Sequence, residues 1–300
     1  MKTTKPERDI VIYLGPGAMA GIFSVGFMQV VMESPVAERI CAMYGVSAGS
    51  VTGLYARSGQ LDQAARLYIE DMSGEQYIRW QQLPAYFLQI LSNRVLRTHV
   101  RTTPLFQSSV VETAVTSKRQ VDITAYNQST VDMKYISYRL DTGTHEYLEI
   151  QSAADIVPVI KATTSGQPGH PDSITIAGQE YIDGATIADE QFLERIQAAH
   201  PDKKIVLVLS STVLQGGRVK RLLMASGVAV LTWILFGFTH ARKVVAQEFT
   251  LASVKANDAV IVIQSEMQGH RFTTDPAVLQ KLLEHGRVKA KVWLDSLEHP

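Results

Sequence analysis

The sequence predicts an α/β fold of three layers, in which helices flank a central, mostly parallel sheet. The prediction depends on continuous apolar runs of strand length, segments of helical spacing between them, and small-residue turns where strand passes into helix. The chain has 300 residues, 46% of them apolar, enough for one large core. No linker divides it, so we expect a single domain over residues 1–300, with its core at about 9–210 and closing helices in 211–300.

The first elements alternate between strand and helix. The apolar run 9–14 predicts a buried strand, which opens into the small-residue loop 15–21. Helical spacing follows over 22–32. A second buried strand is expected at 40–44, and a helix rich in small residues begins at about residue 48. This order is typical of the opening of an α/β domain.

Later segments continue the pattern, with an antiparallel edge on the parallel sheet. Turn residues between short strands, such as Asp141-Thr142-Gly143, predict hairpins at that edge. Strands are expected at 121–126, 133–140, 145–150, 174–176, 180–182, 205–210 and 259–264, and helices at 61–72, 77–96, 104–116, 152–163, 241–257 and 276–297.

A serine lies in the turn after the second strand. The stretch Gly45-Val46-Ser47-Ala48-Gly49 fits the nucleophile-elbow pattern, in which small neighbours make room for a strained strand-to-helix turn. The N-terminus of the following helix presents backbone N–H groups and the positive end of its dipole to the serine oxygen. Ser47 is therefore the candidate nucleophile.

The loop 15–21 has two interpretations. It could cradle a nucleotide pyrophosphate, although the spacing of Gly15, Gly17 and Gly21 misses the dinucleotide fingerprint by one residue. The loop also lacks the lysine and Ser/Thr of a P-loop. Alternatively, its amides could form an oxyanion hole, since N–H groups that face one point stabilise a tetrahedral intermediate. We favour the oxyanion hole.

Together with Tyr181-Ile182-Asp183-Gly184-Ala185, the loop and the elbow resemble the patatin-like phospholipase family. The resemblance covers most of residues 9–210. It implies a serine esterase, without a cofactor, that degrades phospholipids or related lipids through a Ser47/Asp183 dyad. It also implies an oxyanion hole built from the amides of Gly17, Ala18 and Ala48, with tight turns at Gly45, Gly49 and Gly184.

Two residues depart from the family pattern. The usual loop, Gly-Gly-Gly-x-Arg/Lys-Gly, aligns with residues 16–21, where Pro16 has no N–H to donate and Ala20 replaces the basic residue. Two other hypotheses therefore stay open. One is a weakly active or inactive membrane-associated protein of the same fold, and the other is a nucleotide-binding protein that uses residues 15–21.

A Ser-His-Asp triad is the mechanistic alternative to the dyad. A histidine after the acid fits the chain order of α/β-hydrolases, and a rival acid to Asp183 is Asp189. Metal binding is disfavoured because the histidines show no ligand spacing and the chain has one thiol, Cys41, expected to be buried. The candidate histidines by order are His200, His240, His270 and His285.

Charge and hydropathy limit the expected partners. Net charge is zero, which gives no reason to expect nucleic acid. The polar N-terminus lacks the apolar core of a signal peptide, so a cytoplasmic or peripheral membrane location is expected. Residues 222–241 contain no Asp, Glu, Lys or Arg. We interpret them first as a buried or lid helix, then as an interfacial element, and last as a span.

Aromatic residues gather between positions 77 and 87. They are interpreted first as ordinary core, and alternatively as the lining of an acyl-chain channel or a membrane-facing cap. These residues are Tyr77, Trp80, Tyr86 and Phe87. The preferred headgroup and chain length, the oligomeric state and any activating partner are not encoded in a recognisable motif.

Overall fold

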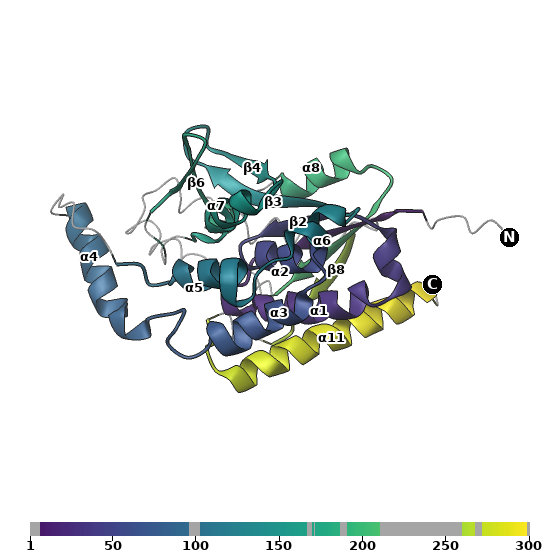
Figure 1. Ribbon diagram of the computed structural model, residues 1–300, viewed down its shortest axis with the longest axis horizontal. Helices are drawn as coiled ribbons and strands as arrows, with labels where there is room; N and C mark the ends of the chain where they lie inside the picture. Colours follow the sequence, from purple (N-terminus) through teal and green to yellow (C-terminus); the bar gives the residue numbers. More distant parts are fainter. Residues whose placement is uncertain are drawn as a thin grey trace, which may run out of the picture.

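The computed structural model describes residues 7–95, 103–166, 170, 172–186, 191–210, 260–267 and 272–298. A mixed eight-stranded sheet runs through the molecule in the order β5-β6-β3-β2-β1-β7-β8, with β4 also paired to β3 (Figure 1). Strands β3, β2, β1, β7 and β8 are parallel, whereas β4, β5 and β6 form an antiparallel edge. The predicted fold class, with its antiparallel edge, is confirmed. The single-domain organisation stays a prediction.

The strands are β1 Ile10–Leu14, β2 Ile40–Val46, β3 Asp132–Arg139, β4 Thr144–Leu148, β5 Ile174–Ile176, β6 Gln179–Asp183, β7 Lys204–Leu209 and β8 Val260–Gln264. The α-helices are α1 Ile22–Met32, α2 Ala48–Arg57, α3 Leu61–Arg66, α4 Leu83–Val95, α5 Ser108–Thr113, α6 Ile123–Gln128, α7 Ala153–Thr164, α8 Phe192–Ala199 and α11 Pro276–Glu298. Short 3₁₀ turns are η1 Ala18–Gly21, η2 Pro35–Arg39, η4 Trp80–Gln82 and η6 Gly184–Thr186, and π-helical turns are η3 Leu67–Asp71 and η5 Ala114–Lys118.

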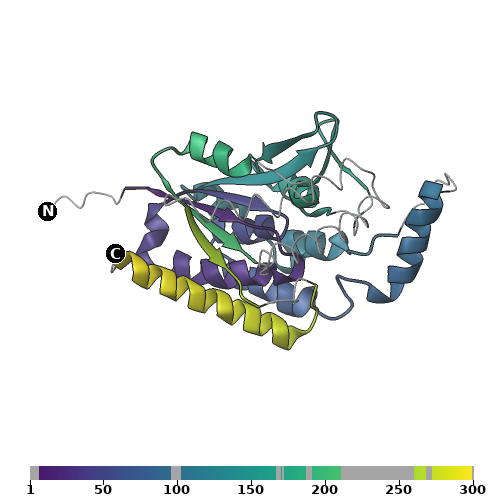
Figure 2. The ribbon, with the colours of Figure 1, turned by 180° about the vertical axis from the view of Figure 1, so that it is seen from behind.

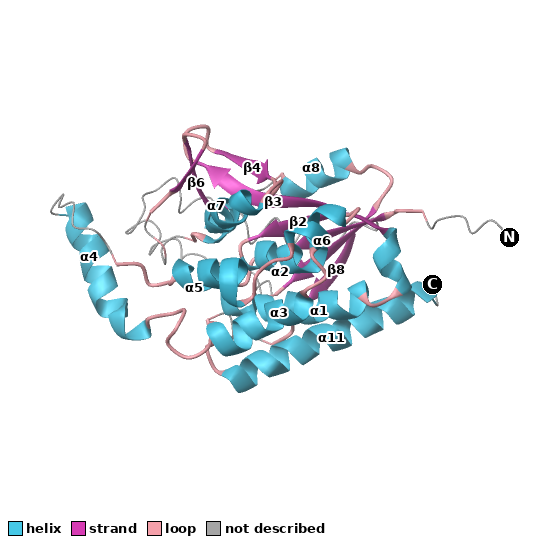
Figure 3. Cartoon of the chain, in the orientation of Figure 1, coloured by secondary structure: helices cyan, strands magenta, loops and turns pink. Residues whose placement is uncertain are grey.

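Helices cover both faces of the sheet, as the alternation of side chains along β1 requires. Ile10, Ile12 and Leu14 belong to the larger apolar cluster, with α1, α2 and α11. Val11 and Tyr13 point to the opposite face and pack with α8. Figures 1 and 3 show α1 and α11 on one side of the sheet and α8 on the other. Because every residue of β1 is buried, the strand is apolar without interruption.

The backbones of the long helix α11 and of α1 pack directly against each other. A Cβ on Gly286 would lie 2.0 Å from the carbonyl oxygen of Phe23, and a Cβ on Gly26 would lie 1.9 Å from that of Leu283. Glycine at both positions therefore allows the two helices to touch without side chains between them. Figure 2 shows α11, in yellow, running alongside α1 when the molecule is seen from behind. The last helix is thus fixed to the first.

The strand predicted at 121–126 is wrong, because residues 123–128 form α6. The reason is a helix N-cap at Asp122, which the pattern of apolar residues does not indicate. The Asp122 side chain accepts hydrogen bonds from the backbone N–H groups of Thr124 at 2.9 Å and Ala125 at 3.0 Å. An aspartate N-cap satisfies orphan amides of the first turn and so favours a helix.

Two predicted helices change type along their length. The segment predicted at 61–72 is α-helical to Arg66 and then π-helical, and the one predicted at 104–116 begins only at Ser108 before it also becomes π-helical. A buried ion pair joins the ends of the two π-turns, since Arg119 Nε lies 2.6 Å from Asp71 Oδ2. Such widened turns need tertiary support of this kind, which local sequence patterns do not reveal.

Some predictions fall on residues that are not described. The apolar stretch 222–241 and the helix expected at 241–257 both lie outside the described residues. Among the helices that are described, none combines the length and apolar character needed to cross a membrane.

Cys41 on β2 is only partly buried, which corrects the expectation that it is buried. Its Sγ donates to the carbonyl oxygen of Ile10 at 3.2 Å. Loss of solvation raises the pKa of the Cys41 thiol. Because the thiolate is the reactive form, this residue is a poor nucleophile at neutral pH.

Candidate active site

Ser47 occupies a strained turn between β2 and α2. Its backbone angles are φ 55° and ψ −123°, a region that residues with a side chain rarely adopt. Among the described residues, only Ala18 and Ala177 share a positive φ without being glycine. Ser47 is half-buried while its neighbours Val46 and Ala48 are buried. The geometry is that of the predicted elbow, in which the serine is lifted out of the strand.

The two glycines beside Ser47 allow α2 to pack against the neighbouring strand. A Cβ on Gly49 would lie 2.0 Å from the carbonyl oxygen of Leu14, and a Cβ on Gly45 would lie 2.8 Å from that of Gly49. Both φ angles are ordinary, because neither glycine has a positive value. Close approach of backbones is therefore the physical reason for glycine at these positions.

The loop after β1 lies beside this turn. Leu14 pairs with Gly45, so the residues that follow β1 adjoin those that follow β2 at the same edge of the sheet. Gly15 donates its N–H to Val208 of β7 at 2.9 Å, which anchors the start of the loop. Ala18 has a φ of 47°, a second strained residue at this edge. Gly17, Ala18 and Ala48 are thus brought to neighbouring turns.

Gly17 and Ala20 are fixed by the folding of the loop. The amide of Ala20 donates to the carbonyl oxygen of Gly17 at 3.0 Å, which closes the 3₁₀ turn η1. A Cβ on Gly17 would lie 2.6 Å from the Cβ of Ser210 at the end of β7. The Ser210 hydroxyl is itself held 2.8 Å from the hydroxyl of Ser24 on α1. The loop therefore has little room to rearrange.

Asp183 lies at the end of β6 and is 3% exposed. Its Oδ1 accepts the N–H of Ala185 at 2.8 Å, a contact that orients the carboxylate. Its own N–H donates to Ser165 at 3.4 Å. The other oxygen, Oδ2, faces Gly166, where a Cβ would approach to 3.2 Å. A Cβ on Gly184 would lie 2.9 Å from the carbonyl oxygen of Ile136, so glycine is needed for this tight turn.

Strand register brings Ser47 and Asp183 to opposite sides of β3. Val46 pairs with Ile136, and Ser137 pairs with Asp183. Ser47, one residue beyond Val46, is therefore level with Asp183 across a single intervening strand. Since neighbouring strands are spaced by about 4.8 Å, the two backbones are separated by roughly 10 Å. Residues 136 positions apart in sequence are thus brought to the same edge of the sheet.

The histidines proposed for a triad receive no support. His200 precedes β7, at the amino end of the parallel strands, whereas Ser47 follows the carboxyl end of β2. Its Nε2 lies 3.0 Å from the hydroxyl of Tyr44. His285 packs edge-on against Phe23, with ring centroids 5.4 Å apart. The other candidates, His240 and His270, and the rival acid Asp189 lie outside the described residues.

Two histidines nearer to Asp183 were not predicted from chain order, because both precede the acid. His145 on β4 places Nε2 2.9 Å from the carbonyl oxygen of Gly184. His170 donates its backbone N–H to Gly166 at 3.0 Å. Both support the loop around the carboxylate. In the described part of the chain, no three His, Cys, Asp or Glu side chains gather as metal ligands would.

An aromatic row leads from this region to the surface. Tyr77 stacks on Phe106 with centroids 5.7 Å apart, Phe106 stacks on Phe272 at 6.0 Å, and Phe272 meets Trp80 edge-on at 6.3 Å. Tyr77 is buried, whereas Trp80 is 40% and Phe272 41% exposed. Burial raises the pKa of Tyr77, and the negative charge of Asp183 raises it further. The charge of the Asp183 carboxylate therefore affects the pKa of Tyr77, the residue at the inner end of the row.

Two of the aromatic residues noted in the sequence do not join this row in the described contacts. Tyr86 is buried and belongs to the main apolar cluster, as expected of ordinary core. The side chain of Phe87 lies outside what the structure describes. Phe272, which is far away in sequence, completes the row instead.

Solved structures that resemble this chain include VipD from Legionella pneumophila. The similarity has 12% identity and a TM-score of 0.45, over 97% of this chain and 67% of that one. No family model matches the sequence, and no curated protein matches it. Similarity at this level assigns neither an activity nor a site residue.

Proposed function

We propose that the protein is a serine acyl hydrolase that cleaves carboxylic esters of lipids, with Ser47 as nucleophile and Asp183 as its base. The main support is the position of Ser47. It is strained and partly exposed at the start of α2, and it is level with the buried carboxylate of Asp183 across β3. A serine hydroxyl needs a base within hydrogen-bond reach. Side chains of Ser47 and Asp183 that are directed toward each other span most of the backbone separation of roughly 10 Å.

Acylation is the first half of the proposed reaction. Ser47 Oγ bonds to the acyl carbon while its proton passes to a carboxylate oxygen of Asp183. The carbonyl π electrons move to the acyl oxygen, and the amides of Gly17, Ala18 and Ala48 stabilise that oxyanion. Collapse breaks the bond to the alcohol oxygen, which leaves with the proton from Asp183. An acyl ester of Ser47 remains.

Deacylation returns the site to its starting state. A water oxygen bonds to the acyl carbon, and one water proton passes to Asp183. When this second tetrahedral intermediate collapses, the bond to Ser47 Oγ breaks and the serine recovers its proton from Asp183. The product is a free fatty acid.

The order of glycine loop, serine elbow and Asp-Gly-Ala segment supports the same reaction by its resemblance to the patatin-like phospholipase family. The nucleotide-binding alternative loses support at the end of β2. An acidic partner for a ribose belongs near the end of a second strand, and there the chain has Ser47. The inactive-scaffold alternative rests on Pro16 and Ala20, and the following experiment decides it.

A fluorophosphonate probe is expected to label the folded protein at Ser47. The probe reacts with a serine hydroxyl only when the site activates it, so the adduct should map by mass spectrometry to the peptide that contains residue 47. Heat-denatured protein is the control and should not react. Well-folded protein that resists the probe would favour the inactive scaffold.

The aromatic row supports a lipid rather than a small ester as substrate. Its exposed end, Trp80 and Phe272, offers apolar area to a membrane surface or an acyl chain. We propose that the chain of the substrate follows the row inward, and that the protein acts at the surface of a membrane, peripherally attached.

Replacing Trp80 and Phe272 with alanine is therefore expected to change chain-length preference. The value of kcat/KM for a sixteen-carbon ester should fall by about tenfold, because burial of even one or two methylenes is worth about 1 kcal/mol or more. The value for a four-carbon ester should stay within about twofold. Val292→Ala on α11, which removes an apolar side chain that is even more exposed, at 61%, is the control elsewhere on the surface. Equal losses for both esters would contradict an acyl-chain role.

A further inference from the structure

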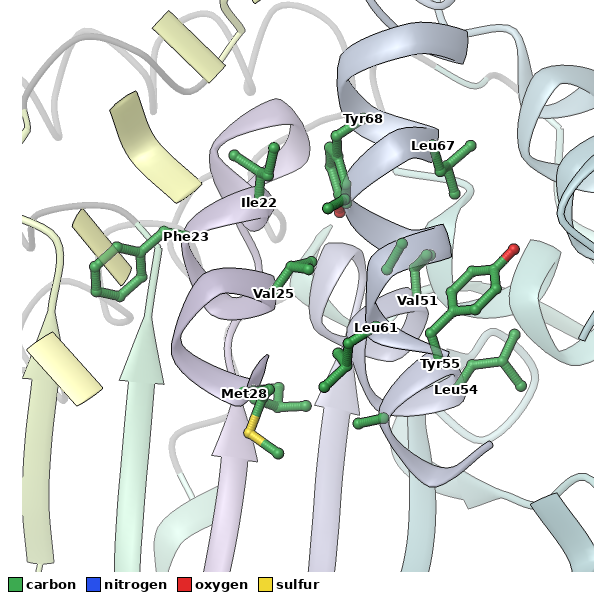
Figure 4. Packing of buried hydrophobic residues seen from close by; sticks show 14 of the residues in the cluster. Ile22, Phe23, Val25, Met28, Val51, Leu54, Tyr55, Leu61, Leu67 and Tyr68 are labelled. Carbon is green, nitrogen blue, oxygen red and sulfur yellow. The ribbon is translucent and has the colours of Figure 1, made fainter. Parts of the chain in front are cut away.

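The side chain of Tyr68 ends at the turn that carries the proposed nucleophile. Tyr68 belongs to the π-helical turn η3 and is 1% exposed. Figure 4 shows its ring beside the helix that carries Ile22 and Val25. It is part of the main apolar cluster by its ring, but its hydroxyl is polar and has to be accounted for separately.

The absence of a side chain at Gly21 leaves room for this hydroxyl. The point where a Gly21 Cβ would lie is 2.7 Å from the Tyr68 hydroxyl and 2.4 Å from the Ala48 methyl. The hydroxyl and residue 48 are therefore neighbours above a glycine that has no side chain to separate them. Ala48 directly follows Ser47, and its amide is one of the proposed oxyanion donors. A phenol this close to residue 48 is a neighbour of the turn that holds the proposed oxyanion donor.

The protonation state of the Tyr68 hydroxyl follows from its surroundings. Burial raises the pKa of Tyr68, and the hydroxyl of Tyr77 raises it further. The phenol therefore stays protonated at neutral pH and can donate.

The position of Tyr68 is held from behind by the π-turn. Met72 donates its N–H to Leu67 at 2.9 Å, which defines the wide turn. The Asp71 carboxylate at its end is locked by Arg119 at 2.6 Å, and both side chains are buried. An uncompensated buried charge is costly, so this pair resists separation. A π-turn fixed by a buried ion pair, with a polar side chain aimed at a reactive turn, is a feature often found at functional sites.

We infer that Tyr68 is a further catalytic residue, whose hydroxyl donates a hydrogen bond to the acyl oxygen as negative charge develops there. The inference rests on the proposed acyl hydrolase reaction. It explains how the hole gains a donor where Pro16 has no N–H. Tyr68 transfers no proton. It holds the oxyanion while Ser47 Oγ bonds to the acyl carbon, and it releases the oxygen when the carbonyl reforms.

Tyr68→Phe tests this directly, because it removes one oxygen and keeps the ring. We expect kcat for a soluble acyl ester to fall about 100-fold with KM nearly unchanged, the usual effect of losing one oxyanion donor. A trifluoromethyl ketone that adds to the serine forms the same oxyanion, so its Kd should rise by a similar factor. Tyr55→Phe is the matched control. Tyr55 is a buried tyrosine whose hydroxyl donates to the carbonyl oxygen of Arg119 at 2.9 Å, and its variant should keep kcat.

The outcomes separate the two proposals. A fall in kcat of less than tenfold, or a large fall without weaker ketone binding, would overturn the role of Tyr68 and leave the Ser47/Asp183 reaction standing. Wild-type protein that neither reacts with the fluorophosphonate probe nor hydrolyses the ester would overturn both.

Discussion

Ser47→Ala is expected to lower kcat for ester hydrolysis by at least about 10⁴-fold, because the variant has no oxygen to form the acyl-enzyme. Ser50→Ala is the matched control. Ser50 is a buried serine one helical turn further on, and its hydroxyl has no hydrogen-bond partner among the described residues. Both variants should unfold at the denaturant concentration of the wild type. Activity retained in the residue 47 variant would end the nucleophile assignment.

Asp183→Asn is expected to have nearly as large an effect, about 10³-fold or more in kcat. The amide oxygen can still accept the N–H of Ala185 that orients the native carboxylate, but an amide cannot take the serine proton. The two effects should be far from additive, since the serine and its base act as a unit. A double variant as slow as Ser47→Ala alone is therefore expected. Additive losses in the double variant would show that the residues act independently.

Gly286→Ala is expected to lower the free energy of unfolding by about 2–3 kcal/mol, measured by urea denaturation. The new methyl group would lie 2.0 Å from the carbonyl oxygen of Phe23, so the backbones of α1 and α11 have to move apart. Helix propensity alone predicts the opposite sign, because alanine stabilises a helix interior by about 1 kcal/mol relative to glycine. A decrease in the free energy of unfolding would therefore show that the backbones of α1 and α11 are in close contact.

Gly53→Ala on α2 serves as the comparison for that stability measurement. Its methyl group would also meet a close neighbour, but the nearest atoms are the Cε and Sδ of Met133, at 2.2 and 2.7 Å. A methionine side chain is flexible and can rotate away. The variant should be close to wild type in stability. A stabilised Gly286→Ala protein would mean that the two helices do not touch in solution.

The sequence predicts the parallel core well because each strand there is recognisable from its own run of apolar residues. Uninterrupted apolar runs such as 10–14 are expected in the middle of a sheet in an α/β protein. The elbow around Ser47 can also be predicted from sequence, since a serine flanked by glycines at this spacing after a buried strand is typical of a nucleophile turn. The backbone angles at Ser47 agree with that expectation.

The parts that sequence reasoning missed depend on tertiary contacts. Residues 121–126 have an apolar pattern that fits a strand, and only the cap at Asp122 turns them into a helix. Tyr68 gives no signal in its own segment, because its importance comes from the glycine at position 21 and from the wide turn that Arg119 secures. Phe272 joins the aromatic row from a distant part of the chain. Pairings across such distances need coordinates.

The place of β1 within the sheet has a consequence for biosynthesis. Although β1 precedes the other described strands in the chain and is therefore made before them, it lies between β2 and β7, and β7 begins at Lys204. At about 5–20 residues per second, one edge of this wholly apolar strand waits roughly 10–40 s for its partner. Unpaired strand edges invite association between nascent chains. The newly made protein should therefore depend on chaperones during this interval, more than its finished, well-packed state suggests.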